Sequence, residues 1–103
     1  MAYYSMYYSL LALLFRVGIK SENHTVSIIL LKELFGLDNS EILEAKEERI
    51  DKQYYVDFKI AEEDVKQMIR AAEHFNAEVF DYMEKLNAEN IRKIRDKFKK
   101  IIS

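Results

Sequence analysis

Two side chains on either side of a short polar connection could together act on RNA. Arg16 and His24 are separated by seven residues, which include the polar stretch KSEN. Arginine offers a fixed positive fork for phosphate, and histidine exchanges a proton near neutral pH. Such a pair could cleave RNA by activating the 2′-hydroxyl and stabilising the charge that develops on the phosphate. The alternative is that Arg16 faces solvent and His24 helps to cap a helix. A match of only two residues is a weak signal, so it favours this alternative.

A second pair, Arg49 and Tyr54, follows later in the chain. Arg49 could anchor a phosphate or bind carbonyl groups of its own chain. Tyr54 could stack on a base or fill a gap in the core. We favour the packing role for Tyr54, because tyrosine combines an apolar ring with a polar tip.

Basic residues dominate the C-terminal end. Residues 88–103 hold six basic and two acidic side chains, a net charge of +4, whereas residues 1–87 carry −6. The basic residues are Arg92, Lys93, Arg95, Lys97, Lys99 and Lys100. They flank an apolar stripe and could meet RNA, an anionic membrane or an acidic partner surface. The alternative, slightly favoured, is a helix that packs by its apolar stripe and keeps the protein soluble by its charges.

A metal or cofactor site is only weakly indicated. His74 and Glu78 would lie one helical turn apart, with Arg70 one turn before them, but two ligands make a poor metal site. The chain has no cysteine, and its two glycines form no phosphate-binding loop. We therefore expect His74 to be an ordinary surface residue, and we expect no metal and no cofactor.

The elements that position these residues are predicted to be helices. The chain has two glycines and no proline, and no long stretch alternates apolar and polar residues. Helices are expected at about residues 2–17, 24–35, 38–52 and 61–86. A fifth helix or a sharp kink is expected at Asn87 and Asn90. The stretch QYYVDFKIAEED is interpreted as a packed connection.

Several residues are expected to begin or end these helices. Gly18 and Gly36 are typical stops, and Ser21 or Asn23 could cap the second helix. Asp38, followed three residues later by Glu41, matches a capping box. Two sets of residues with a seven-residue spacing predict that residues 61–86 face other helices: Val65, Ala72, Val79 and Leu86, and Met68, Phe75 and Tyr82. We therefore expect a single all-α domain over residues 1–103, an antiparallel up-and-down bundle of four to five helices.

The first predicted helix is apolar nearly all round. No basic residue precedes its apolar part, unlike a signal peptide, and Arg16 interrupts it before the roughly 20 residues that a membrane span needs. Other helices or a second subunit must therefore cover it. We expect a cytoplasmic protein, not associated with a membrane, that forms a homodimer. The expected interface residues are Tyr3, Tyr4, Tyr7, Leu11 and Leu14.

The stretch AYYSMYYSLLALLFRVGIKSENHTVSIILLKELFG resembles the core of a HEPN domain in its small stand-alone prokaryotic form. The matching positions are Ala2, Tyr3, Tyr4, Tyr7 and His24. Arg49 with Tyr54 five residues later is similar to a second motif of the family. Residues 61–86 resemble its closing amphipathic helix. The resemblance ends there, so the basic helix at residues 87–103 lies outside it.

The resemblance implies an antiparallel helical bundle that forms dimers. Many members are encoded beside a minimal nucleotidyltransferase, form the toxin half of a toxin–antitoxin pair and act as metal-independent ribonucleases. The ribonuclease motif of the family places arginine and histidine closer together than the seven residues between Arg16 and His24. Stand-alone members also begin with a further helix that covers the tyrosine-rich one. Here the basic C-terminal helix or a second subunit would provide that cover.

The sequence therefore favours a HEPN-like component of a toxin–antitoxin system with a nucleotidyltransferase partner, which binds RNA or a nucleotide. The residues expected to bind are Asn23, His24, Arg49, Tyr54, Arg92, Lys93, Arg95 and Lys97. Two alternatives remain open. One is a metal-independent ribonuclease with Arg16 and His24 as catalytic residues, and the other is a non-catalytic dimerisation module.

Overall fold

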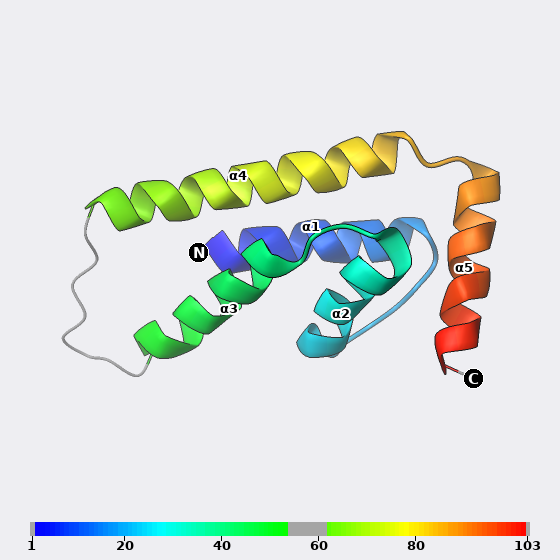
Figure 1. The fold of residues 1–103 in the computed structure, drawn as a ribbon, viewed down its shortest axis with the longest axis horizontal. Helices are drawn as coiled ribbons and strands as arrows, with labels where there is room; N and C mark the ends of the chain where they lie inside the picture. Colours follow the sequence, from blue (N-terminus) through cyan, green and yellow to red (C-terminus); the bar gives the residue numbers. More distant parts are fainter. Residues whose placement is uncertain (1, 54–61, 103) are drawn as a thin grey trace.

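The regular structure of the described chain is helical. The computed structural model describes residues 2–53 and 62–102. This part of the chain contains no strand and five helices (Figure 1): α1 Ala2–Arg16, α2 His24–Phe35, α3 Ser40–Gln53, α4 Glu62–Glu84 and α5 Ala88–Ile102. The expected all-α class is thus confirmed. Among the described residues, no helix combines the length and apolar character that crossing a membrane requires.

α1 is the central helix. It packs against α2, α3 and α4, most extensively along α4. Its inward side chains are buried by the rest of the chain: Tyr3, Met6, Tyr7, Leu10, Leu13 and Leu14. Burying a large apolar side chain stabilises a fold by about 1.5–3 kcal/mol. α1 therefore provides much of the core, as its apolar composition predicts.

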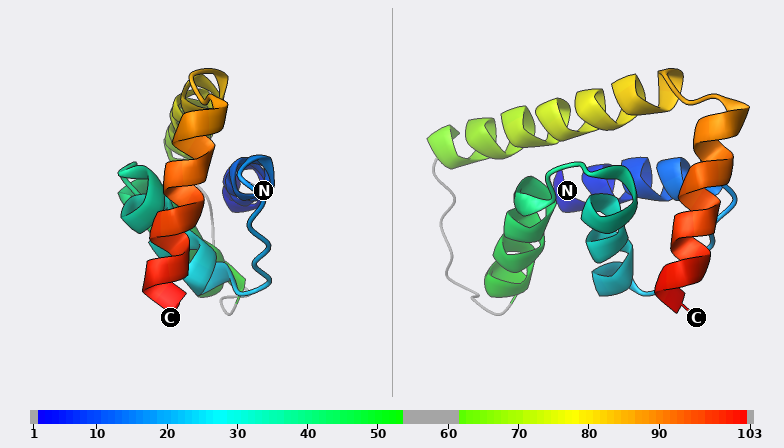
Figure 2. Two further views of the ribbon diagram at one scale, coloured as in Figure 1. Left: turned by 90° about the vertical axis from the view of Figure 1, so that its right-hand side faces the viewer. Right: turned by 45° about the vertical axis from the view of Figure 1, so that its right-hand side comes forward.

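The antiparallel up-and-down arrangement is not confirmed. In Figure 1, both α1 and α4 run from left to right, and the second panel of Figure 2 shows the same direction. The most extensively packed pair is therefore parallel. This is possible because α2 and α3 are short, with 12 and 14 residues against the 23 of α4, and together return the chain to its starting end.

The two glycines end helices as expected. Gly18 and Gly36 have φ angles of 79° and 66°, in the left-handed region that glycine adopts without strain. After Gly18, the N–H of Ile19 donates to the carbonyl of Leu14 at 2.9 Å. These contacts satisfy carbonyl groups that would otherwise lack partners at the end of α1.

α3 begins in a different way from the predicted capping box. The Asp38 carboxylate accepts hydrogen bonds from the backbone N–H and the hydroxyl of Ser40, at 3.0 and 2.8 Å. These two bonds lower the pKa of Asp38. The helix starts at Ser40, and the Glu41 carboxylate contacts His74 of α4. Glu41 thus has a partner on another helix that local sequence does not reveal.

The contact between α1 and α4 combines an apolar seam with a polar cluster. The buried residues of the expected seam are Ala72, Phe75 and Val79, whereas Val65 is 39% exposed. Beside the seam, Ser9 Oγ donates to Asn76 Oδ1 at 2.7 Å, and Asn76 Nδ2 donates to Ser5 Oγ at 2.9 Å. Paired polar groups at an apolar contact favour one register over its alternatives.

α5 is a separate helix, which is one of the two alternatives, helix or kink, that the sequence leaves open. The backbone N–H of Asn90 donates to the side chain of Asn87 at 2.8 Å, and the reverse bond measures 3.4 Å. α5 packs against α2, with Ile94 buried in the core. It does not supply the expected cover over α1, because Tyr8 and Phe15 remain 65% and 85% exposed.

Candidate functional site

The structure does not bring together the two residues expected to form a ribonuclease site. Arg16 is the last residue of α1, whereas His24 contacts Tyr3 near the first turn of the same helix. At about 1.5 Å per residue, the rise from Tyr3 to Arg16 is about 20 Å. The connection bends away from the end of α1 and leads down to the start of α2 (Figure 1), from where His24 reaches Tyr3. Within a single chain, Arg16 and His24 are therefore too far apart to contact the same phosphate.

His24 belongs to an aromatic cluster. A hydrogen bond of 2.8 Å joins its Nδ1 to the Tyr3 hydroxyl. Its ring stacks on that of Tyr7, with ring centres 3.9 Å apart and planes 22° apart. Because Tyr3 and Tyr7 are 2% and 5% exposed, His24 closes the edge of the core at this end of α1. These contacts give the residue a packing role.

Asn23 serves as the N-terminal cap of α2. Its side-chain oxygen accepts a hydrogen bond from the N–H of Val26 at 3.0 Å. Its own carbonyl accepts from the hydroxyl of buried Ser27 at 2.9 Å. The prediction that Asn23 and His24 lie at the start of α2 is confirmed, and of the two proposed caps Asn23 fills the position. Both oxygens of Asn23 thereby support the helix.

The second expected pair lies largely beyond what the structure describes. The backbone of Arg49 belongs to α3. Its side chain and the whole of Tyr54 lie outside the described residues. Phosphate binding by this pair stays a prediction.

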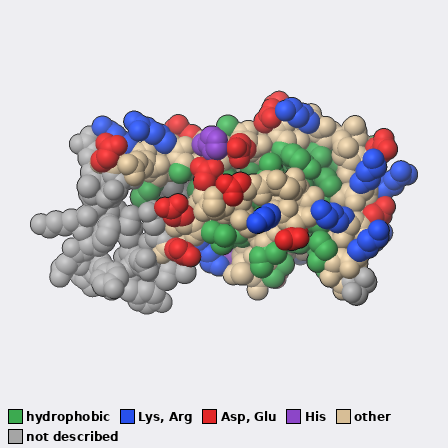
Figure 3. All heavy atoms as spheres, in the orientation of Figure 1, with side chains coloured by type: hydrophobic (Ala, Val, Ile, Leu, Met, Phe, Trp, Pro, Cys, Tyr) green, Lys and Arg blue, Asp and Glu red, His purple; other side chains and the backbone are tan. Residues whose placement is uncertain are grey.

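A basic surface covers part of α5. Arg92, Arg95 and Lys99 line a hollow of 300 Å³ together with Ala88, Ile91 and Asp96. Lys93 lies 3.4 Å from the carboxylate of Glu89, one turn earlier, and Lys97 is exposed. Figure 3 shows lysine and arginine side chains gathered at the end of the molecule that α5 occupies. Four of the residues expected to bind RNA are thus solvent-accessible on one helix.

Arg95 also connects this surface to the turn after α1. A methyl group built on Gly18 would lie 3.6 Å from the guanidinium carbon of Arg95. The guanidinium therefore lies against the backbone of the turn, two residues beyond Arg16. The end of α1 and the basic face of α5 are neighbours, which places the positive charge of two separate elements at one end of the fold.

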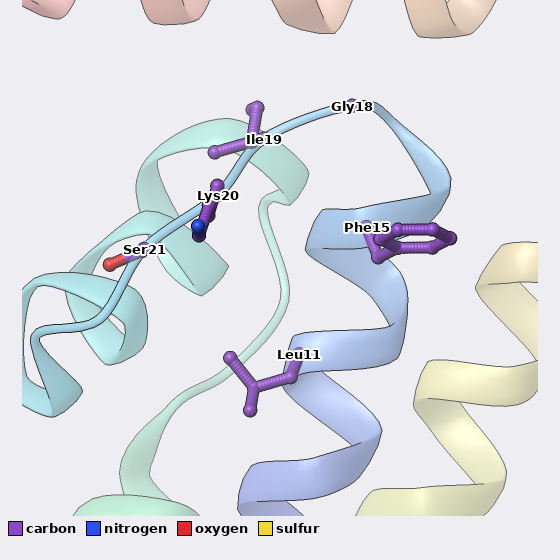
Figure 4. A pocket seen from close by; sticks show the side chains of 6 residues that line it. All are labelled: Leu11, Phe15, Gly18, Ile19, Lys20 and Ser21. Carbon is purple, nitrogen blue, oxygen red and sulfur yellow. The ribbon is translucent and has the colours of Figure 1, made fainter.

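The outer face of α1 is apolar and open to solvent. We call this face the outer stripe, and it consists of Tyr4, Tyr8, Leu11 and Phe15. Tyr4 and Tyr8 have ring centres 6.4 Å apart. Leu11 and Phe15 border an open groove of 730 Å³, whose remaining lining comes from residues 18–21 of the following connection (Figure 4).

The residues expected at a dimer interface divide between the two faces of α1. Tyr3, Tyr7 and Leu14 are buried in the core of the single chain. Tyr4 and Leu11 are partly buried and belong to the outer stripe. Tyr8 and Phe15, absent from the expected set, are its most exposed members. Both faces follow the same helical spacing, so no local signal distinguishes them.

Comparison with known proteins provides no relative from which a function could be transferred. Neither protein-family models, nor curated proteins, nor solved structures contain a match to this chain.

Proposed function

We propose that the protein is a HEPN-like helical module that works as a homodimer, formed through the outer stripe of α1. The observation that carries this proposal is the exposure of Tyr8 and Phe15, 65% and 85%, on a helix whose other faces are buried. A soluble protein seldom exposes a continuous apolar surface unless a partner covers it.

The chemistry of α1 supports a second copy of the chain as that partner. A twofold interface places a patch against its own copy, so a net charge on the patch would repel the second copy. Residues 2–15 carry no charge. Tyr4 and Phe15 are separated by a rise of about 16 Å, at about 1.5 Å per residue, so the outer stripe extends along most of the helix. Tyrosine is enriched at interfaces because its ring packs while its hydroxyl finds a polar partner.

Charge substitutions in the outer stripe test this proposal. Wild-type protein should sediment as a dimer at micromolar concentration, and Phe15→Glu should sediment as a folded monomer. Phe15 is exposed in the single chain, so its replacement should leave the circular dichroism spectrum unchanged. Ile29→Glu, at a half-exposed position of α2, is the matched control and should remain dimeric. A monomeric wild-type protein, or a dimeric Phe15→Glu variant, would refute the proposal.

As a second function, we propose that the basic surface of α5 binds RNA. The supporting observation is that Arg92, Arg95 and Lys99 line the same hollow. Fluorescence anisotropy with single-stranded RNA should show an affinity that falls steeply with salt, because each neutralised phosphate releases counterions. Arg92→Gln and Lys99→Gln should weaken binding. Lys85→Gln, which removes a lysine that pairs with Asp81 on α4, should not. Binding that is insensitive to salt would exclude this function.

The resemblance to HEPN proteins supports two further proposals. One is a minimal nucleotidyltransferase as the partner within a toxin–antitoxin system, which co-purification of the two proteins tests. The other is ribonuclease activity, which would require Arg16 of one subunit and His24 of the partner subunit at a shared site. RNA cleavage in the presence of a chelator, lost on His24→Gln and on Phe15→Glu, would support such a composite site.

A further inference from the structure

Three side chains that are distant in sequence converge between α3 and α4. Glu41 lies in the first turn of α3, and His74 and Glu78 lie one turn apart on α4. His74 Nδ1 is 2.8 Å from Glu41 Oε1, and His74 Nε2 is 3.4 Å from Glu78 Oε1. One ligand atom from each residue can be chosen so that all lie within 4.8 Å of one another. Figure 3 shows a histidine beside acidic side chains on the face in view.

The cluster matches what a divalent transition metal requires. Imidazole nitrogen and carboxylate oxygen are both ligands of zinc, and a site with three protein ligands leaves the fourth position to water. Around a tetrahedral zinc ion with bonds of about 2.0–2.1 Å, neighbouring ligand atoms lie about 3.3 Å apart. In the structure Glu41 lies beside Nδ1 and Glu78 beside Nε2 of the same ring. One ion binds a single ring nitrogen, so one carboxylate would have to rotate toward it from within the 4.8 Å that separates the three groups.

The electrostatic setting also favours a cation. Two carboxylates face the same imidazole from neighbouring helices. Their negative charges would attract a cation that binds at a ring nitrogen.

We propose that Glu41, His74 and Glu78 bind one divalent transition-metal ion, of which zinc is the representative, and that the ion fastens the first turn of α3 to the middle of α4. An imidazole ligand favours zinc, cobalt, nickel and copper over magnesium and calcium, which prefer oxygen ligands alone. This inference is independent of the dimer and of RNA binding, because the cluster lies on neither the outer stripe nor α5.

The ion would strengthen a weak point of the fold. Ile42 is fully buried, but its neighbours Leu43 and Ala45 are exposed and partly buried, respectively. α3 therefore has few apolar anchors near its start. A ligand bond from Glu41 would hold this turn to α4 in the folded state, and binding to the folded state alone raises its stability.

Calorimetric titration of the chelator-treated full chain with zinc chloride tests the proposal. We expect one zinc ion per chain. His74→Gln, Glu78→Gln and Glu41→Gln should each weaken binding about tenfold or more, since each removes a ligand. Glu73→Gln removes an exposed carboxylate from α4 that does not belong to the cluster, and it should leave the affinity unchanged.

Thermal unfolding provides a second readout. Zinc should raise the melting temperature of the wild type and of Glu73→Gln, a chelator should reverse the rise, and magnesium should have no effect. Absence of saturable zinc binding below millimolar concentration would overturn the proposal. So would a Glu41→Gln variant that is folded by circular dichroism and binds zinc as tightly as the wild type, because adventitious binding by the pair on α4 would then explain the result.

Discussion

The two histidines of this chain occupy opposite kinds of environment. His24 is partly buried, hydrogen-bonded to a tyrosine hydroxyl and stacked on the ring of Tyr7. The side chain of His74 is 61% exposed and faces two carboxylates. An imidazole among aromatic rings contributes packing, whereas an imidazole among carboxylates is positioned to carry a proton or a metal ion.

The environment of each histidine is the opposite of what its neighbours in the sequence suggest. His24 follows the polar stretch KSEN, which is typical of an exposed functional loop, yet its contacts are those of the core. His74 lies off the apolar seam of an amphipathic helix, which is typical of an ordinary surface residue, yet Glu41 of α3 contacts it. Which neighbours a histidine meets across the fold, rather than along the chain, decides what it can do.

The largest effect expected from this comparison is the loss of stability on His24→Ala. The substitution removes a stacked ring from Tyr7 and a hydrogen-bond partner from the hydroxyl of Tyr3. Together these should lower the free energy of unfolding by about 1–3 kcal/mol. Urea denaturation measures the change, and His74→Ala, with chelator and at a pH above the raised pKa of His74, is the matched control. A His24→Ala variant as stable as the wild type would show that the aromatic cluster does not contribute to the core.

Tyr3→Phe isolates the hydrogen bond within that cluster. It keeps the buried ring and removes the hydroxyl, so the expected loss is about 0.5–1.5 kcal/mol, less than for His24→Ala. Combining the two substitutions in a double-mutant cycle yields the coupling between Tyr3 and His24. Strictly additive losses would mean that the 2.8 Å contact does not stabilise the fold.

His74 should make the stability of the metal-free protein depend on pH. Its pKa in the folded protein is raised above the ordinary value of 6.5, so the folded state binds the proton more tightly than the unfolded state. The stabilisation is complete below 6.5 and is lost as the pH rises through the raised pKa. Urea unfolding at several pH values with chelator should therefore show a decline that His74→Gln lacks. Identical pH profiles for the two proteins would contradict this.

The smallest expected effect distinguishes the contributions that Glu41 and Glu78 make to the pKa of His74. The hydrogen bond that the His74 ring donates to Glu41 is the main cause of the raised pKa of His74, ahead of the charge of Glu78. An NMR titration of the ring should therefore show a larger fall in the pKa of His74 on Glu41→Gln than on Glu78→Gln. The opposite order would place Glu78, and not Glu41, as the closer partner in solution.

Local sequence determined the helices and their ends. Gly18 and Gly36 stop α1 and α2 as predicted, and Asn23, one of the two predicted caps, starts α2. α5 begins at the predicted junction of Asn87 and Asn90, whereas the capping box predicted for α3 did not form. These signals could be found because a cap acts on backbone groups only a few residues away. The apolar composition of α1 likewise predicted a helix covered by other helices or by a second subunit, since burial follows from how much of a helix surface is apolar.

The tertiary structure alone decided which faces and which distant residues meet. The set Tyr3, Tyr7 and Leu14 and the set Tyr4, Tyr8 and Phe15 have equal helical spacing, so the pattern could not reveal that the first set is inside. The separation of Arg16 from His24 follows from the path of the connection to α2, which brings His24 to Tyr3 at the other end of α1. The meeting of Glu41 with His74 depends on how α3 packs against α4. Such contacts join residues far apart in the chain, and their geometry is set by the packing of whole helices, for which no short motif exists.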